Sequence, residues 1–175
     1  LAPTPSMTGE PRSPMPWRPM TAADIPAVSA IAVRVHPSYP ERDAVFADRI
    51  ALAPEGCWLA ERDGVPLGYL LSHPWREGAP PPLDTELKAL PGEADTFYLH
   101  DLALLPEARG MGLAREIVLA TIARAAPLFP SLSLVAVNGS VPFWAGFGFV
   151  VTDRPELAEK LESYDADARY MVRPS

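Results

Sequence analysis

The stretch Arg109-Gly110-Met111-Gly112-Leu113-Ala114 decides the fold, because it joins a predicted strand to a predicted helix through two closely spaced glycines. The strand is the apolar run 96–105, and the helix, predicted over 110–124, has apolar residues at helical spacing. A strand-to-helix turn leaves backbone N–H groups unpaired and points them, with the positive end of the helix dipole, at one spot. Small residues let a phosphate approach that main chain, so the turn predicts an anion site.

Two better-known phosphate-binding turns do not fit this stretch. A P-loop ends in Lys followed by Ser or Thr, where this chain has Leu113-Ala114. A dinucleotide fingerprint needs glycine or alanine at position 115, which is Arg115, and an acidic residue about 20 residues further on, where the chain reads Ser-Leu-Ser-Leu. An ordinary tight connection remains an alternative, but one glycine would suffice for it.

The order of predicted elements points to one sheet covered by helices. We expect strands near 17–20, 57–62, 65–72, 96–105, 132–137, 147–152 and 169–172, and helices over 25–35, 41–51, 110–124 and 141–146. A capping box, Thr21 to Asp24, precedes the first helix, and His36-Pro37 ends it. The strand–helix–strand unit over 96–137 implies one parallel crossover in a mixed sheet, so the fold class is α/β or α+β.

Composition bounds the function. The 175 residues suit one domain, and 15 basic against 22 acidic residues give a formal charge of −7, which does not suit a nucleic-acid binder. The single Cys57 excludes an intramolecular disulfide and a multi-cysteine zinc site. No apolar run approaches the ~20 residues of a membrane span and the start lacks a signal-peptide pattern, so we expect a cytoplasmic protein without a membrane partner. Because prolines crowd the beginning, we expect an extended arm over 1–16 and the domain over 17–175.

The glycine stretch, read as Arg/Gln-x-x-Gly-x-Gly/Ala, resembles the pyrophosphate motif of the GNAT superfamily of acetyl-CoA-dependent N-acetyltransferases. Three further blocks resemble that family in the same order: Arg18–Asp24, His100–Arg109, and Leu134–Asn138 with Phe143–Phe149. The likeness covers roughly residues 17 to 173. It implies an α/β (α+β) fold with a mixed, mostly antiparallel central sheet and helices on both faces.

The resemblance also implies acetyl-CoA as cosubstrate and names the residues that would bind it. Main-chain groups of one strand would hold the thioester carbonyl and the pantetheine, the glycine turn would hold the pyrophosphate, and the next strand and short helix would complete the site. These residues are Leu102, Ala103, Leu104, Arg109, Gly110, Met111, Gly112, Leu113, Ala114, Arg115, Asn138, Phe143 and Trp144. Trp144 departs from the family pattern, which has a tyrosine there as general acid; an indole N–H can donate a hydrogen bond but cannot give up its proton near pH 7.

His100 is the predicted catalytic base. Strand alternation would place it on one face with Tyr98 and Leu102, and Asp101 on the other face in a structural role. In some members of the resembling family a histidine at this position lies on the route by which the proton of the amine leaves, and imidazole is suited to that task. The alternative is a histidine that fills a gap in the core.

The acceptor pocket is predicted from four residues that border it in the resembling family: His36, Tyr39, His73 and Trp75. The histidines show no short ligand spacing, so we predict no metal. Two acidic segments, 77–95 and 153–168, each carry a net charge of −4. They are either a rim that attracts amines or solvated loops.

The sequence therefore predicts an enzyme that moves an acetyl group from acetyl-CoA to a primary amine of a small molecule. A peptide or protein amine as acceptor is one alternative, and a non-catalytic acyl-CoA-binding sensor is another. The resemblance also allows a homodimer.

Overall fold

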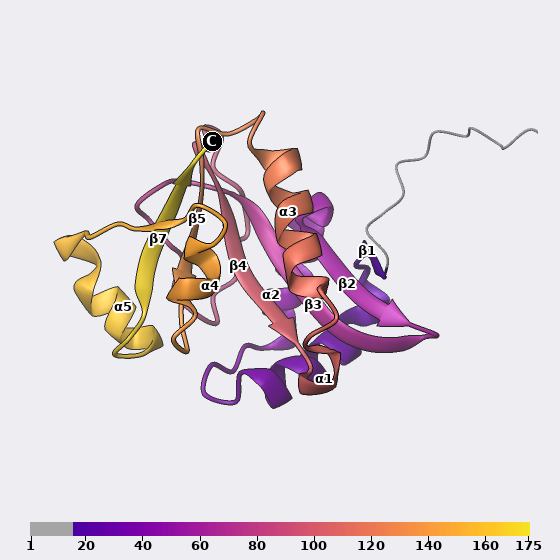
Figure 1. The fold of residues 1–175 in the computed structure, drawn as a ribbon. Helices are drawn as coiled ribbons and strands as arrows, with labels where there is room; N and C mark the ends of the chain where they lie inside the picture. The colour runs from indigo at the N-terminus through magenta and orange to yellow at the C-terminus, as the bar shows by residue number, and fades with distance from the viewer. Residues whose placement is uncertain (1–15) are drawn as a thin grey trace, which may run out of the picture.

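The computed structural model describes residues 16–175, so the predicted arm 1–16 lies outside the described residues except for its last residue. The chain forms seven strands and five α-helices within this range (Figure 1). In chain order they are β1 (Trp17–Pro19), α1 (Ile25–Val35), α2 (Asp43–Leu52), β2 (Cys57–Arg62), β3 (Val65–Trp75), β4 (Thr96–Leu104), α3 (Leu113–Ala125), β5 (Ser131–Ala136), α4 (Val141–Ala145), β6 (Val150–Val151), α5 (Ala158–Tyr164) and β7 (Arg169–Pro174).

The strands form one sheet in the order β1-β2-β3-β4-β5-β7-β6. Every neighbouring pair is antiparallel except β4 and β5, which are parallel and joined by the crossover through α3. The predicted mixed, mostly antiparallel α/β sheet with a single parallel crossover is confirmed.

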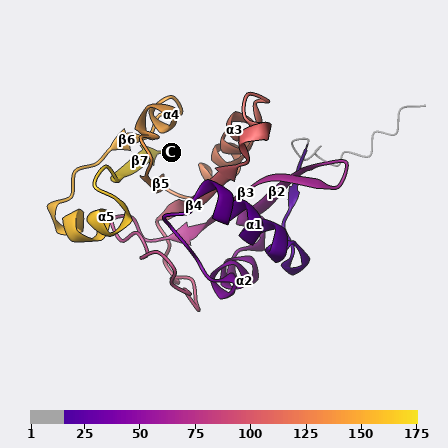
Figure 2. The same cartoon turned by 90° about the horizontal axis from the view of Figure 1, so that it is seen from below.

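Helices cover both faces of the sheet, as predicted (Figure 2). On one face α3 and α4 pack on β4 and β5 around Ile117 and Trp144, and we call this the α3–α4 core. On the other face α1 and α2 pack on β2 and β3 around Ile31 and Phe46, which we call the α1–α2 core. Each strand of the middle of the sheet is therefore buried on both sides.

The first helix starts where the capping box predicts. The carboxylate of Asp24 accepts three hydrogen bonds of 2.8 Å. One comes from the backbone N–H of Thr21 and two come from the terminal nitrogens of Arg18. The hydrogen bonds from Arg18 lower the pKa of Asp24, against the opposing effect of burial. This ion pair ties β1 to the start of α1.

The central feature of the sheet is a split between β4 and β5. The two strands pair only from Phe97 to Leu99 on β4 and from Leu132 to Leu134 on β5. Beyond this point β4 continues to Leu104 without a strand on that side. A β-bulge lies at the same place, because Leu71 pairs with Asp101 and the next residue, Ser72, pairs with Leu99, which leaves His100 as the extra residue.

Some elements differ from the prediction for identifiable reasons. Helix α3 starts at Leu113 and not at Gly110, because Gly110 and Gly112 have left-handed φ angles of 82° and 76°. Strand β3 runs to Trp75, beyond the predicted 72, and β6 keeps only two of the predicted six residues. Helix α5 was not predicted: none of its residues is buried, so it has no apolar period to detect.

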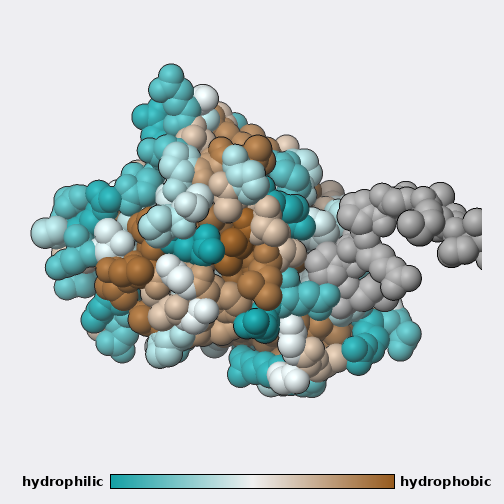
Figure 3. All heavy atoms as spheres, turned by 45° about the horizontal axis from the view of Figure 1, so that its top comes forward, coloured by the Kyte–Doolittle hydropathy of each residue, from teal (hydrophilic) through white to brown (hydrophobic). Residues whose placement is uncertain are grey.

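The described surface mixes polar and apolar residues. On the face shown in Figure 3, apolar residues gather toward the middle and polar residues toward the periphery. The most exposed large apolar side chains of residues 16–175 are Leu128, Val33, Val150 and Val65. Within the same range, no helix has the length and apolar character needed to cross a membrane.

Candidate active site

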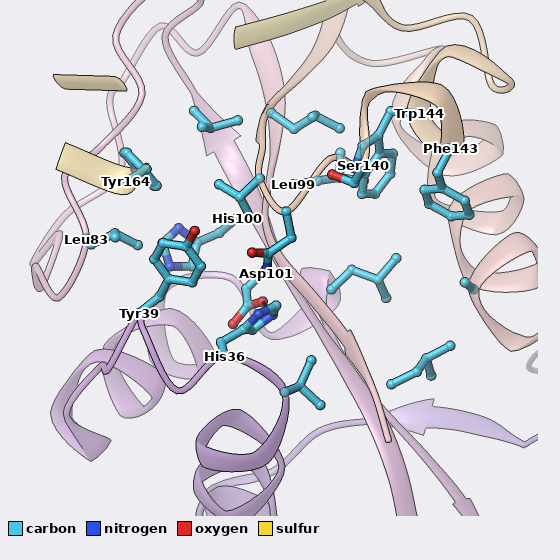
Figure 4. Close-up of a pocket in the computed structure, with 18 of the residues that line it drawn as sticks. His36, Tyr39, Leu83, Leu99, His100, Asp101, Ser140, Phe143, Trp144 and Tyr164 are labelled. Carbon is cyan, nitrogen blue, oxygen red and sulfur yellow. Dashed lines mark ion pairs between the residues drawn. The ribbon is translucent and has the colours of Figure 1, made fainter. Parts of the chain in front are cut away.

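A cleft of about 370 Å³ opens where β4 and β5 part (Figure 4). Its walls come from the end of α1 and the following loop, from β4, from β5, and from α4, with Leu83 and Tyr164 at one side. Ten of the residues predicted for the site line it: His36, Tyr39, His100, Leu102, Leu104, Arg109, Ala114, Asn138, Phe143 and Trp144.

The glycine turn lies beside this cleft and forms the start of α3. Gly112 is the N-cap residue of the helix in a left-handed conformation, and no side chain caps it. The first N–H groups of α3 are therefore available to an anion. Arg109 lines the cleft, while Met111 and Arg115 are exposed and Leu113 is buried in the α3–α4 core. Such a turn can hold a diphosphate through main-chain groups with Arg109 close by.

The bulge at His100 reverses which residues of β4 face each side of the sheet. Before it Leu99 packs in the α3–α4 core, and after it Leu102 and Leu104 pack there. Ala103 instead packs in the α1–α2 core, so only its main chain can reach the cleft. Past Leu99 the free edge of β4 carries backbone groups that no β5 residue pairs. These groups can polarise a carbonyl and hydrogen-bond an amide-bearing chain.

The bulge also overturns the predicted arrangement of His100 and Asp101. His100 does not share a face with Leu102, and Asp101 does not face the side of the sheet opposite to His100. Both side chains lie toward α1 and the loop after it, and each pairs with a residue from there. Strand alternation was the wrong guide because it assumes regular pairing, which the extra residue breaks.

Two histidine–carboxylate pairs result, side by side at the cleft. His100 Nε2 lies 2.9 Å from Glu41 Oε1, and His36 Nε2 lies 2.9 Å from Asp101 Oδ1. The hydroxyl of Tyr69 donates to the other oxygen of Asp101 at 2.5 Å. The first pair is almost completely buried, whereas the side chains of His36 and Asp101 are about one-seventh exposed, at 15% and 14%.

The charge state of His36 reflects this pairing. Burial opposes protonation, but the hydrogen bond and charge of Asp101, with the charge of Glu41, outweigh it and raise the pKa of His36 above 6.5. Folding thus makes the cationic form of His36 easier to reach than it is for a free histidine.

Two residues predicted for the acceptor pocket lie outside the cleft lining. His73 is fully buried behind His100, and its pKa is lowered to about 3, chiefly by burial. Trp75 packs edge-on against His73 and donates its indole N–H to Ala79 O at 2.7 Å. The prolines after His36 and His73 both favour extended backbone, but they do not determine which side chain faces the cleft.

The short helix α4 supplies an unpaired donor. Trp17, Trp58 and Trp75 each donate their indole N–H to a backbone carbonyl, at 3.0, 3.1 and 2.7 Å. The N–H of Trp144 has no partner within residues 16–175, and its nitrogen is not sealed in the interior. Ser140, one turn earlier, lines the cleft beside it and does not cap the helix (Figure 4).

Sequence reasoning missed several residues of the cleft, above all Glu41, Asp101, Ser140, Leu83 and, as a lining residue, Tyr164. Most lie in loops or in the unpredicted α5, and they carried no periodic or motif signal.

A polar link also spans the two sides of the cleft. The Tyr39 hydroxyl donates to Asp165 at 2.6 Å, which joins the loop after α1 to the segment after α5.

Within the described residues no three His, Cys, Asp or Glu side chains group as ligands of one metal ion.

The sequence model described as "Acetyltransferase (GNAT) family" matches residues 24–149. The chain therefore belongs to the GNAT acetyltransferase family, whose reaction is acyl transfer from a CoA thioester. No curated protein sequence is significantly similar to it.

Solved structures share the fold at low sequence identity. The GphF GNAT-like decarboxylase in complex with isobutyryl-CoA has a TM-score of 0.71 and 17% identity, over 90% of this chain and 98% of that one. The NatC complex bound to Gag peptide and CoA has a TM-score of 0.65 and 18% identity, over 91% and 97%. Naa50 of Arabidopsis thaliana, in complex with the bisubstrate analogue CoA-Ac-MVNAL, has a TM-score of 0.65 and 17% identity, also over 91% and 97%.

The pair of His36 and Asp101 makes a prediction about stability. Because the pKa of His36 is raised on folding, the pair stabilises the fold most below pH 6.5, and this contribution is lost as the pH rises through the raised value. His36→Gln should lower the free energy of unfolding by about 1–3 kcal/mol at pH 5.5 and by less at pH 8.5. Urea unfolding of both proteins at the two pH values measures this, and a pH-independent difference would contradict it.

Proposed function

We propose that this protein transfers the acetyl group of acetyl-CoA to a primary amine of a small molecule. The observation that carries the proposal is the split between β4 and β5, with the glycine turn beside one part of the cleft and two histidine–carboxylate pairs at another. The first part suits a diphosphate-bearing cosubstrate. The second suits an amine that must lose a proton.

In the proposed reaction the amine nitrogen attacks the thioester carbonyl carbon. The free edge of β4 around Leu102 donates to the carbonyl oxygen as it gains negative charge. The N–C bond forms, the C–S bond breaks, and the electron pair leaves with sulfur as the CoA thiolate. The pair of His100 and Glu41 accepts the proton that the amine releases, at the carboxylate of Glu41, which lines the cleft and lies 2.9 Å from Nε2 of His100.

The indole N–H of Trp144 is the proposed donor to the thiolate. An indole does not transfer its proton in this pH range, so it stabilises the sulfur anion by a hydrogen bond and water protonates the thiolate afterwards. A thiol ionises near pH ~8.5, so a dedicated acid is not obligatory.

A small acceptor is favoured because the cleft is crossed at its acceptor side. The Tyr39–Asp165 hydrogen bond joins the two walls there, and Leu83 and Tyr164 line the same side, an arrangement that suits a small acceptor better than an extended chain. A peptide amine is the second candidate, since two of the structural relatives carry peptide-derived ligands in their complexes.

The test of the function is a transfer assay with acetyl-CoA against two panels, small primary amines and peptides with free N-termini. Release of free CoA is followed with a thiol reagent, and acetylated products are identified by mass spectrometry. Turnover of peptides alone would reject the small-molecule acceptor. Tight CoA binding without turnover of either panel would identify a sensor.

Gly112→Val should abolish most CoA affinity, because its left-handed backbone presents the N–H groups at the start of α3. A Cβ added at Gly112 meets no protein atom within 4 Å, so we expect the variant to lose stability chiefly through the strained φ, by about 1–2 kcal/mol. Gly64→Val is a matched control: its φ is 77°, its surroundings are equally open, and it lies in the β2–β3 turn. Calorimetry with CoA should show loss of affinity of about tenfold or more for Gly112→Val only.

His100→Gln should lower kcat/KM for the amine by about 10²–10⁴-fold while leaving acetyl-CoA binding intact, since main-chain groups hold the cosubstrate. The kcat/KM that remains in the variant should no longer fall at acid pH. If His100→Gln keeps the wild-type rate at neutral pH, His100 is a packing residue and the base lies elsewhere.

Trp144→Phe should lower kcat by about 10- to 100-fold, the effect of losing a hydrogen bond to a charged group, with little change in the KM for acetyl-CoA. Trp58→Phe removes an indole whose N–H is already paired with Glu55 O, away from the cleft, and serves as the control. An unchanged kcat in Trp144→Phe would show that the ring only packs.

A further inference from the structure

Behind the cleft lies a set of buried nitrogen atoms that the proposed reaction does not use. His73 Nε2, His100 Nδ1, and Nε and Nη2 of Arg49 are all sealed from solvent, and none has a hydrogen-bond partner in the described part of the chain. The three side chains are at most 1% exposed. Buried polar groups are normally paired, so four unpaired nitrogens in one region call for a ligand.

The hydrogen bonds of the two imidazoles determine where their protons lie. Glu41 can only accept, so His100 carries its proton on Nε2, and Nδ1 is a bare lone pair. The carbonyl of Pro74, 2.9 Å from His73 Nδ1, can also only accept, so His73 carries its proton on Nδ1 and its Nε2 is bare. Both unpaired imidazole nitrogens are therefore acceptors.

These two acceptors belong to neighbouring rings. The centroids of His73 and His100 are 6.4 Å apart, and both rings pack on Tyr98. Two acceptors cannot bond to each other, but one water can donate to both, since two hydrogen bonds of about 2.8 Å span roughly 4–5 Å across its oxygen. A ring separation of 6.4 Å leaves room for this span between nitrogens on the facing edges of the two rings.

Arg49 is a buried positive charge whose field reaches the two imidazoles. It is a fully buried residue of α2 whose Nη1 is held by Asp48 at 3.0 Å and by the carbonyl of Thr85 at 2.9 Å. Its charge acts on His73, Tyr98 and Tyr164 alike.

The chemistry selects water over other ligands. An anion would satisfy Arg49 but not the two imidazole lone pairs. A metal ion would satisfy the lone pairs, but the guanidinium would repel it. Water has two hydrogens to donate, so a single water satisfies both imidazole lone pairs.

We propose that one buried water joins His100 to His73, and that His73 is thereby a positioning residue for His100. The role rests on the proposed function of the His100–Glu41 pair. The water donates to Nδ1 of His100 and to Nε2 of His73, and His73 is neutral because burial lowers its pKa to about 3. With Nδ1 held in this way, Nε2–H of His100 points at Glu41.

Two measurements on the unmodified chain test the water without any assay. An atomic-resolution crystal structure should show a single oxygen within hydrogen-bond distance of His73 Nε2 and His100 Nδ1. Long-range ¹H–¹⁵N spectra of the imidazoles at neutral pH should show His73 as the Nδ1–H form and His100 as the Nε2–H form. A metal ion at this place, no bridging oxygen, or the opposite tautomers would overturn the proposal, whether or not the protein turns over an amine.

Two variants then separate positioning from packing. His73→Gln keeps an acceptor oxygen but loses the ring, whereas His73→Phe keeps a ring against Trp75 and Tyr98 but loses the acceptor. Positioning predicts that kcat falls about tenfold in His73→Phe and stays within about twofold in His73→Gln, with the KM for acetyl-CoA unchanged in both. His100 should keep one tautomer in His73→Gln only. The reverse order of the two variants would show that His73 merely packs.

Discussion

The parting of β4 from β5 after Leu99 is the constraint on which the rest of the site depends. A strand that continues without its neighbour leaves main-chain donors and acceptors that need partners. In this chain those groups face a cleft, and the bulge at His100 coincides with the parting, so one irregularity opens the sheet and re-aims the side chains. Because β3 pairs with β4 along its whole length, the free edge is held in place from the other side.

The bulge also explains why chemistry collects on one side of the cleft. Regular alternation would have put His100 and Asp101 on opposite faces of the sheet. The extra residue lets both lie toward α1 and the loop that follows it, where His36 and Glu41 meet them. In one pair β4 supplies the histidine, and in the other it supplies the carboxylate. Both pairs also attach the loop after α1 to β4. The groups proposed to move protons therefore also stabilise the side of the cleft that they line.

Burial divides the histidines into different chemical types. His36 lies beside Asp101 and its pKa is raised, whereas His73 is enclosed among apolar and aromatic side chains and its pKa is lowered to about 3. The pKa values of identical side chains are thus shifted in opposite directions, because a paired carboxylate favours the cation and desolvation favours the neutral ring. Only the folded structure sets these surroundings.

The sequence by itself determined the strands of the sheet, four of the five α-helices of the described chain and the position of the glycine turn, because alternation, helical spacing and paired glycines are local properties of the chain. It also singled out His100 as the proposed base, from strand alternation and the family resemblance. The sequence could not indicate that Glu41 pairs with His100 or that Asp101 lies beside them. It also placed His73 in the cleft, whereas the structure places it behind the cleft. Those relations depend on a one-residue bulge and on loops that meet only in three dimensions, for which no period or motif exists. Tertiary structure decided which polar residues share the cleft, and the physical reason is that register and burial arise between segments, not within them.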